Sequence, residues 1–293
     1  MSRIQDILAK AERDGTARRT QATGSFAPGP APAAFPQPPA PRPPTSAGRL
    51  DGRVDGTSAL DDAPVTAGAT EPPGPSAVVD ARTATPTLHP LLVAAIEPHA
   101  DVAERYRSIR ARISHREETM PVRTMMVTSP GAGDGKSITA ANLALTMAQE
   151  LQRRVVLVDA DFRGSSLHAL FGLDGAPGLA EVLTGEATLD EVMVHMPDYR
   201  LTVIPAGRTP QFPTELLGST AMRRIVDTLR GRFDRVLFDT PAVMPLADAG
   251  TFAPMADGVL MVVRAGLTPR PALDRALSAF DEDRVLGVVL NDI

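Results

Sequence analysis

The sequence has 293 residues, of which 43% are hydrophobic and 22% are charged, and its formal net charge is −5. This composition supports a packed core, and the acidic balance argues against a dedicated nucleic-acid-binding protein. Cysteine is absent, which excludes disulfide frameworks, zinc fingers and thiol catalysis. No apolar run approaches the roughly 18 residues of a membrane span, and the first residues lack the apolar core of a signal peptide. We therefore predict a cytoplasmic protein.

The first 90 residues differ in composition from the rest and hold 15 of the 28 prolines. Residues 1–15 have the spacing of a short amphipathic helix, which either docks on a partner or on the protein itself, or is a frayed terminus. Residues 16–88 are rich in Pro, Ala, Gly, Ser and Thr, and such a segment buries too little apolar area to offset its ordering entropy. We predict a disordered Pro-rich linker at 16–88 and one globular domain at 89–293.

Short apolar runs alternate with helical stretches after residue 90. Residues 91–116 predict a helix that Pro98 divides in two. Continuous apolar runs are typical of strands buried on both faces, and helices between them predict β-α-β crossovers. The expected fold class is α/β, a mostly parallel sheet flanked by helices. The runs are Met125–Val127, Val155–Val158, Leu201–Ile204, Val236–Phe238, Val259–Val263 and Val285–Leu290.

A glycine-rich loop follows the first run, where residues 129–137 read Ser-Pro-Gly-Ala-Gly-Asp-Gly-Lys-Ser. The residues after it predict a helix with an apolar stripe that includes Ile138 and ends at Leu151. Glycines let backbone N–H groups point at an anion, and a helix N-terminus adds partial positive charge. In such a loop Lys136 reaches the β- and γ-phosphates and the Ser137 hydroxyl binds Mg²⁺. The pattern predicts a nucleoside triphosphate site.

The alternative to a nucleotide site is an ordinary glycine-rich turn. The 30 basic residues include two lysines, Lys10 and Lys136, so the loop keeps a lysine in a chain that otherwise uses arginine. The usual pattern has glycine at the position of Pro130, which is a departure. The flanking strand and helix favour the nucleotide site.

Acidic residues close two further apolar runs. Asp159 and Asp161 follow the second run, with Arg163 after them, and Asp239 ends the fourth in the order Asp-Thr-Pro. Ligands of parallel sheets lie beyond the carboxyl ends of the strands, and Mg²⁺ prefers oxygen ligands. The alternative is that the first two acids only cap a helix or form a turn. Three motifs in this order favour phosphoryl transfer.

These three motifs together resemble the bacterial tyrosine kinases (BY-kinases) of capsule and exopolysaccharide biosynthesis, in particular their cytoplasmic members of the CpsD/CapB type. Segments 164–173 and 178–185 are also similar to that family. The resemblance covers about residues 90–293 and implies a P-loop NTPase fold of the MinD/ParA-like group. It implies ATP and Mg²⁺ as cofactors, and a membrane polysaccharide co-polymerase as activating partner that recruits the protein to the inner face of the membrane. It also implies a homo-oligomer assembled through Glu104, Arg107 and Arg110; a salt-bridged surface is the alternative for these three residues.

The resemblance also suggests roles for individual residues. As catalytic residues we expect Lys136, Asp159, Asp161 and Asp239, with Asp161 orienting the attacking hydroxyl or accepting its proton. As magnesium ligands we expect Ser137, Asp159 and Asp239. The expected nucleotide-binding residues are Gly131, Ala132, Gly133, Asp134, Gly135, Lys136, Ser137, Ile138, Arg163 and Asn291.

One departure from the family concerns tyrosine. Family members usually carry a tyrosine-rich tail, whereas this sequence has two tyrosines, Tyr106 and Tyr199, and neither lies in a tail. The expected function is an ATP-dependent protein-tyrosine kinase that regulates polysaccharide polymerisation and export. The alternatives are a non-kinase ATPase switch of the MinD/ParA-like type and an ATP-bound scaffold. Gly131 stands where the switch ATPases carry an extra lysine, which counts against the first alternative.

Overall fold

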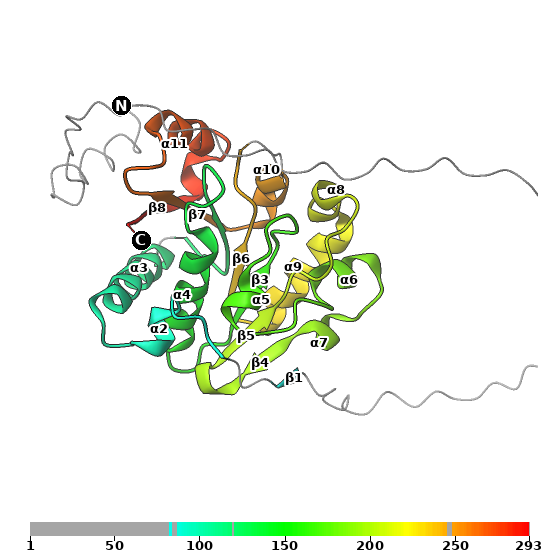
Figure 1. Cartoon of the computed structure of the whole chain (residues 1–293). Helices are drawn as coiled ribbons and strands as arrows, with labels where there is room; N and C mark the ends of the chain where they lie inside the picture. The colour runs from blue at the N-terminus through cyan, green and yellow to red at the C-terminus, as the bar shows by residue number, and fades with distance from the viewer. Residues whose placement is uncertain (1–81, 84–86, 119, 245–247, 293) are drawn as a thin grey trace, which may run out of the picture. The chain divides into compact units, whose positions relative to one another are not determined.

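An eight-stranded sheet, in the order β1-β4-β5-β3-β6-β2-β7-β8, runs through the part of the chain that this computed structural model describes, residues 82–83, 87–118, 120–244 and 248–292 (Figure 1). These residues belong to one unit of the chain, Ala77–Ile293. The helix expected at 1–15 and nearly all of the linker expected at 16–88 lie outside the described residues.

The six predicted apolar runs are all strands, and neighbours among them pair in parallel. Every residue of the four central strands is buried, as continuous apolar runs predict. The mostly parallel α/β fold is therefore confirmed. The strands are β2 (Thr124–Thr128), β3 (Val155–Asp159), β5 (Leu201–Ile204), β6 (Arg235–Asp239), β7 (Gly258–Arg264) and β8 (Val285–Asn291).

Two further strands extend one edge of the sheet and were not predicted. β4 (Val194–Met196) pairs antiparallel with β5, and β1 (Arg82–Thr83) pairs in parallel with β4. With three and two residues, both are shorter than the runs from which strands are recognised in a sequence.

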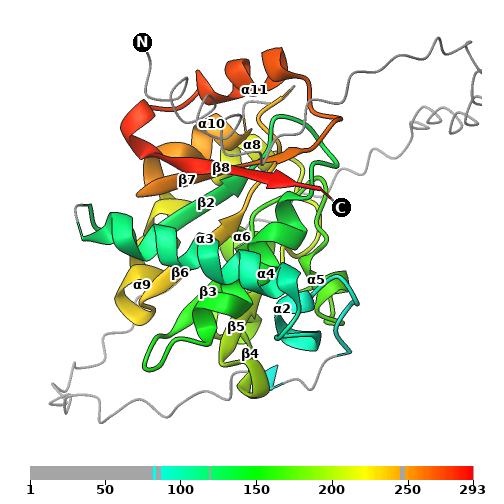
Figure 2. The same cartoon turned by 90° about the vertical axis from the view of Figure 1, so that its left-hand side faces the viewer.

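Helices cover both faces of the sheet. In Figure 2, α2 (Val93–Ile96), α3 (Asp101–Glu117) and α4 (Lys136–Ala148) lie in front of the strands, and α9 (Thr220–Arg232) lies behind them. Pro98 lies between α2 and α3, so the predicted break is confirmed. The other helices are α5 (Leu167–Leu170), α6 (Leu179–Thr184), α7 (Leu189–Val192), α8 (Pro213–Leu217), α10 (Asp248–Phe252) and α11 (Arg270–Leu277), with 3-10 turns at Pro197–Tyr199, Ala253–Met255 and Glu282–Arg284.

The helix after the glycine loop, α4, is buried along its whole length except at Ile138. It packs Leu143 and Met147 against the core beside Leu157 and Leu237 of the sheet. The predicted apolar stripe is wrong at its end, because α4 stops at Ala148 and Leu151 is 84% exposed. The chain turns directly after the helix, where Gln152 has a φ of 62°, so residue 151 no longer follows the helical period.

None of the helices within the described ranges has the length and apolar character needed to cross a membrane.

Candidate functional site

The glycine loop joins β2 to α4 at the carboxyl edge of the sheet. Gly133 and Gly135 have φ values of 85° and 92°, in the left-handed region that favours glycine. Gly131, which directly follows Pro130, does not have a positive φ. Gly135 is the N-cap of α4 and provides no side-chain hydrogen bond to the helix. The first N–H groups of α4 therefore remain available for an anion.

A cavity of about 490 Å³ opens in front of this helix N-terminus. Its walls come from the loop, from the acidic segment after β3 and from residues Pro241, Ala242 and Met244 after β6. The structure brings the following predicted site residues to this cavity: Ala132, Gly133, Gly135, Lys136, Ser137, Ile138, Asp161 and Arg163.

Lys136 lies at the base of the cavity and is 9% exposed. Its Nζ is 2.6 Å from Oδ2 of Asp161, 3.8 Å from Oδ1 of Asp239 and 3.2 Å from Oγ of Ser137. Burial acts to lower the pKa of Lys136, but the charges of Asp239 and Asp161 outweigh it and raise the pKa. The lysine is thus held as a cation among carboxylates.

Asp159 and Asp161 shape the segment after β3. The carboxylate of Asp159 accepts hydrogen bonds from Asp161 N at 3.1 Å, Ser165 Oγ at 2.9 Å and Leu167 N at 3.2 Å. Burial raises the pKa of Asp159 to about 6. Asp161 accepts from the N–H groups of Arg163 and Gly164 through Oδ1, which leaves Oδ2 for Lys136. The Asp159 side chain therefore holds the segment after β3 together, and it does not line the cavity.

Asp239 is fully buried, and neither of its carboxylate oxygens has a hydrogen-bond partner in the described part of the chain. Burial raises its pKa to about 7, although the charge of Lys136 opposes this shift. Asp239 pairs in register with Asp159 across β3 and β6. A buried carboxylate that lacks a hydrogen bond and lies 3.8 Å from the Lys136 Nζ fits a cation ligand. The described ranges hold no group of three or more histidine and acidic side chains that could bind a metal by themselves, so phosphate oxygens and water would have to complete the shell.

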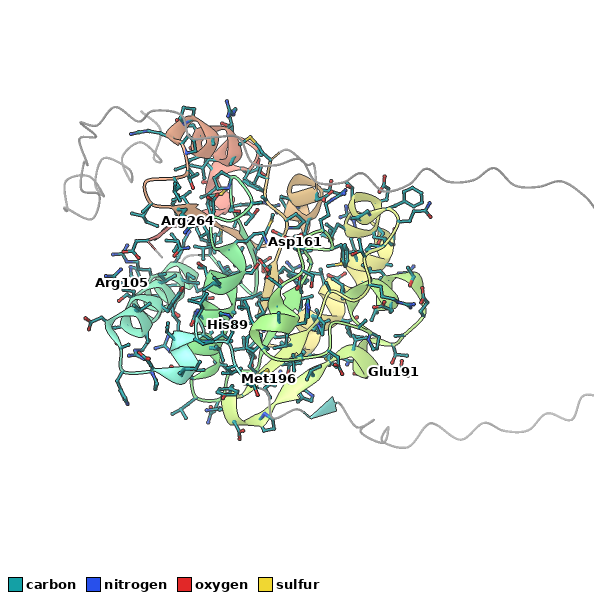
Figure 3. The ribbon with its side chains drawn as sticks, in the orientation of Figure 1. His89, Arg105, Asp161, Glu191, Met196 and Arg264 are labelled. Carbon is teal, nitrogen blue, oxygen red and sulfur yellow. The ribbon has the colours of Figure 1, made fainter. Side chains whose placement is uncertain are left out.

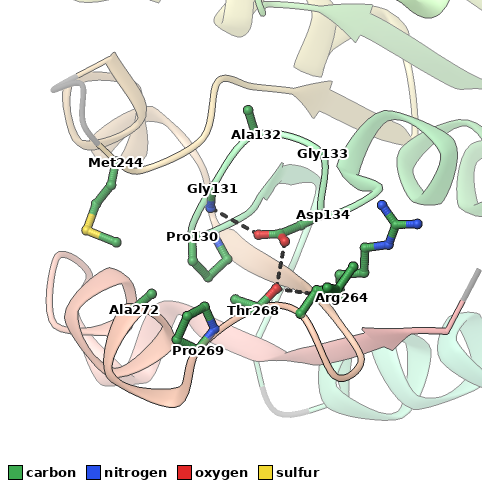
Figure 4. A pocket seen from close by; sticks show the side chains of 11 residues that line it. Pro130, Gly131, Ala132, Gly133, Asp134, Met244, Arg264, Thr268, Pro269 and Ala272 are labelled. Carbon is green, nitrogen blue, oxygen red and sulfur yellow. Dashed lines mark hydrogen bonds between the residues drawn. The ribbon is translucent and has the colours of Figure 1, made fainter. Parts of the chain in front are cut away.

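Gly131 and Asp134 lie apart from the cavity of the lysine. The Asp134 carboxylate accepts the Gly131 N–H at 3.0 Å and the Thr268 hydroxyl at 2.6 Å (Figure 4). Both residues line a second cavity of about 480 Å³, on the other side of the loop. The Gly131 N–H is therefore engaged within the loop.

Asn291 ends β8 and supports the loop from outside. Its Nδ2 donates to the Asp134 carbonyl at 3.1 Å. A Cβ at Gly135 would lie 1.9 Å from this Nδ2, so only glycine fits there. The Asn291 side chain lines neither of the two cavities beside the loop.

Arg163 is at the cavity wall, but its guanidinium is engaged with other side chains. Nε donates to Oδ2 of buried Asp248 at 2.8 Å, and Nη2 donates to the Thr214 hydroxyl at 3.4 Å. The Thr214 hydroxyl donates in turn to Asp248.

Asp161 lies at the same end of the sheet as Arg264, the last residue of β7 (Figure 3).

Sequence reasoning missed Thr268 and Asp248, which hold the loop and Arg163. Thr268 follows β7 by four residues, and Asp248 begins α10. Neither belongs to a recognisable motif, because each acts through a contact between segments far apart in the sequence. The pattern offered no signal for them.

The predicted assembly residues on α3 make contacts within the chain. Arg107 pairs with Glu104 at 2.7 Å. Arg110 donates to the Thr146 carbonyl at 2.8 Å and pairs with Glu150 at 3.3 Å, both near the C-terminal end of α4. Arg110 therefore joins two helices of the same chain.

Several curated relatives of this chain are named tyrosine-protein kinases. Tyrosine-protein kinase YwqD of Bacillus subtilis (strain 168) is 33% identical over 202 residues, which are 68% of this chain and 85% of YwqD. Tyrosine-protein kinase CpsD of Streptococcus agalactiae is 31% identical over 193 residues, 65% of this chain and 83% of CpsD. Tyrosine-protein kinase ptk of Acinetobacter johnsonii is 33% identical over 204 residues, 69% of this chain, which span only 28% of that protein.

Solved structures agree with these relatives. The chimerical protein CapA2B2 matches with a TM-score of 0.66 and 28% identity, over 73% of this chain and 93% of that one. The kinase domain of the Escherichia coli tyrosine kinase ETK matches with a TM-score of 0.65 and 27% identity, over 68% of this chain and 79% of that one. The ParA family, described as NUBPL iron-transfer P-loop NTPase, matches residues 122–202. The chain has a P-loop NTPase fold and belongs to the family of bacterial tyrosine-protein kinases.

Proposed function

We propose that this chain is an ATP-dependent protein-tyrosine kinase. The observation that carries the proposal is the arrangement at the cavity: an uncapped helix N-terminus and a buried lysine, whose Nζ lies beside the buried carboxylates of Asp161 and Asp239, in a chain 33% identical to YwqD over most of YwqD's length. Phosphoryl transfer requires mainly placement of the reactants and neutralisation of charge, and these groups provide both.

The N–H groups from Ala132 to Ser137 would hold the phosphates of ATP, with Lys136 at the β- and γ-phosphates. Ser137 and Asp239 would hold Mg²⁺, and Asp159 would support its shell. The bound ion would neutralise charge on the transferring phosphoryl group. The fit rests on the carboxylate oxygens of buried Asp239, which accept no hydrogen bond from the described residues. When phosphates enter, Lys136 exchanges its ion pair with Asp161 for a phosphate oxygen.

The freed Asp161 carboxylate then takes the proton of the attacking tyrosine hydroxyl. The tyrosine oxygen forms a bond to the γ-phosphorus, the bond from that phosphorus to the β,γ-bridging oxygen breaks, and ADP leaves. The Oδ1 hydrogen bonds from Arg163 N and Gly164 N orient Asp161 for this role.

Neither of the two tyrosines in this sequence is presented as an acceptor. Tyr106 is 7% exposed on α3, and burial raises its pKa, so its hydroxyl is not presented to a second active site. Tyr199 is partly buried and packs against the core. We place the substrate among the proteins of capsule or exopolysaccharide polymerisation and export, on the strength of the family.

A partner and an assembly complete the proposal. The partner is a membrane polysaccharide co-polymerase, and copies of the chain assemble through α3. The Glu104 side chain is 66% exposed and available there, together with Arg107. Light scattering tests this: Glu104→Ala with Arg107→Ala lowers the oligomer mass, and exposed Arg112→Ala on the same helix is the control. Arg110 is left intact because it joins α3 to α4.

The kinase activity is tested with full-length protein, Mg-ATP and a copolymer of glutamate and tyrosine. Wild type transfers phosphate to the copolymer, and Lys136→Met does not. Lys10→Met, which replaces the only other lysine, behaves as wild type. Full turnover by Lys136→Met would overturn the site. ATP hydrolysis that depends on Lys136 without any tyrosine phosphorylation would identify an ATPase switch instead.

A further inference from the structure

Asp134 is the centre of contacts that fix the glycine loop from the side away from the lysine. Its side chain is 7% exposed, and each carboxylate oxygen has a different partner. Oδ2 accepts the Gly131 N–H at 3.0 Å, which closes the loop on itself. Oδ1 accepts the Thr268 hydroxyl at 2.6 Å, which ties the loop to the segment after β7.

Thr268 is itself held rigidly in a turn. Its hydroxyl accepts the Arg264 N–H at 2.8 Å, and its own N–H donates to the Arg264 carbonyl at 3.0 Å. Pro269, the next residue, is the N-cap of α11. The Thr268 hydroxyl therefore accepts a hydrogen bond from the end of β7 and donates one to the Asp134 carboxylate of the loop. Figure 4 shows these contacts beside the cavity of about 480 Å³.

A parallel contact comes from β8. Asn291 donates to the Asp134 carbonyl, and the Ala265 N–H donates to the Asn291 carbonyl at 2.7 Å. The backbone and side chain of Asp134 are thus both bonded to the β7–β8 side of the sheet. Gly133 and Gly135, the flexible residues of the loop, flank this fixed point.

We propose that Thr268 and Asp134 are positioning residues for nucleotide binding, acting as a brace that holds the phosphate loop in its binding shape. A loop with two glycines at positive φ has many accessible conformations when unsupported, and ordering it on binding costs affinity. Because the brace already orders the loop in the folded protein, the entropy cost of ordering it falls on folding and not on nucleotide binding. The inference rests on the proposed nucleotide site but concerns the side chains of Thr268 and Asp134, which do not line the cavity of the lysine.

The test measures binding of a fluorescent ADP analogue to the full chain carrying Thr268→Val, Thr268→Ser or the wild-type threonine. Hydrogen bonds to charged groups are stronger than neutral ones, so Thr268→Val is expected to weaken binding about ten-fold. Thr268→Ser keeps the hydroxyl and binds as wild type. Thr228→Val removes an exposed hydroxyl on α9 and is the matched control.

A second readout separates positioning from loss of fold. Amide hydrogen exchange of residues 129–137 is expected to accelerate in Thr268→Val and not in Thr268→Ser, while the β3 and β6 amides keep their wild-type protection. In the double variant Asp134→Ala with Thr268→Val, binding is expected to equal that of Asp134→Ala alone, because the two residues act through one contact.

The outcomes are distinguishable. If wild type binds no nucleotide, the proposed function fails. If wild type binds and Thr268→Val binds equally well with unchanged loop exchange, the brace is wrong. If Thr268→Val loses protection throughout the sheet, Thr268 stabilises the fold and does not position the loop. Additive losses in the double variant would also overturn the brace.

Discussion

Asp239 shows at the scale of one residue how a binding site is maintained at a cost in stability. Its carboxylate is fully buried without hydrogen bonds from the described residues, and burial raises its pKa to about 7. An acid with a raised pKa in the native state retains its proton when the unfolded chain has already released it. Between about pH 4 and pH 7 the native state therefore binds more protons, and stability falls as pH rises.

We predict that Asp239→Asn raises the thermal midpoint of the metal-free protein at pH 8 by a few degrees, since about 1 kcal/mol corresponds to ~2–4 °C in a domain of this size. At pH 5, where wild-type Asp239 is protonated, the difference is small. Thermal unfolding with a chelator at both pH values measures this, and kinase activity is lost in the same variant. A lower midpoint for the variant at pH 8 would contradict the argument.

The sequence predicted that the lysine and the acids meet at one edge of the sheet, but not the individual contacts that they make. Lys136 and Asp239 meet because parallel strands end at one edge, which a motif implies. The engagement of Gly131 with Asp134 was not predictable, since a side-chain acceptor within the loop competes with phosphate for that N–H. Likewise Arg163 reaches Asp248, a partner that only the fold brings near.

At the scale of elements, buried Asn142 joins α2 to α4. Its Oδ1 accepts the Ala94 N–H at 2.9 Å, and its Nδ2 donates to the carbonyls of Leu91 at 2.9 Å and Ile138 at 3.0 Å. The side chain is fully buried on a helix face that also carries buried Thr139 and Thr146. These hydrogen bonds satisfy the backbone groups of Leu91 and Ala94 at the N-terminal end of α2.

We predict that Asn142→Leu destabilises the protein by about 2–4 kcal/mol, because buried donors and acceptors lose their partners. Chemical denaturation measures the change. Gln149→Ala is the control, since exposed Gln149 also donates to this helix, at the Ala94 carbonyl, and its loss is expected to cost less than about 1 kcal/mol. Equal losses of unfolding free energy in both variants would show that the buried Asn142 hydrogen bonds stabilise the protein no more than the one made by exposed Gln149.

Elements were predictable where one physical signal dominates. Five of the six apolar runs became strands whose residues are almost all buried, whereas β8 is half-buried along most of its length. β4 carries His195, whose ring is hydrogen-bonded to Thr202 of β5 at 2.8 Å, so its short sequence shows no such run. Leu151 shows the converse error, an apolar residue at helical spacing beyond the point where the helix ends.

At the scale of the whole molecule, strand order assembles the site from distant sequence. β2 lies between β6 and β7, and β6 lies beside β3, so the loop after β2 is flanked by Asp239 on one side and by Thr268 on the other. The acids beside Lys136 thus come from the ends of β3 and β6, while Thr268 comes from the turn after β7. The acids and the brace therefore lie on opposite sides of the loop, at the ends of different strands of one sheet.

This arrangement predicts that nucleotide binding resides in the unit Ala77–Ile293. The residues that line the lysine cavity extend from Ala132 to Met244, and the supports of the loop extend to Asn291. A variant that starts at Ala77 keeps β1 and α2, and its ADP affinity is expected to match that of the full chain within about 0.5 kcal/mol, the usual limit for independent changes.

A variant that starts at Ala100 is the control for this truncation. It removes α2, whose Ala94 N–H is bonded to Asn142, so it is expected to unfold at a lower temperature. Titration with a fluorescent ADP analogue and thermal unfolding of all three proteins measure both effects. Loss of binding in the Ala77 variant, with its thermal midpoint unchanged, would place part of the nucleotide site in residues 1–76. An unchanged midpoint in the Ala100 variant would show that α2 contributes nothing to the stability of the sheet's helical layer.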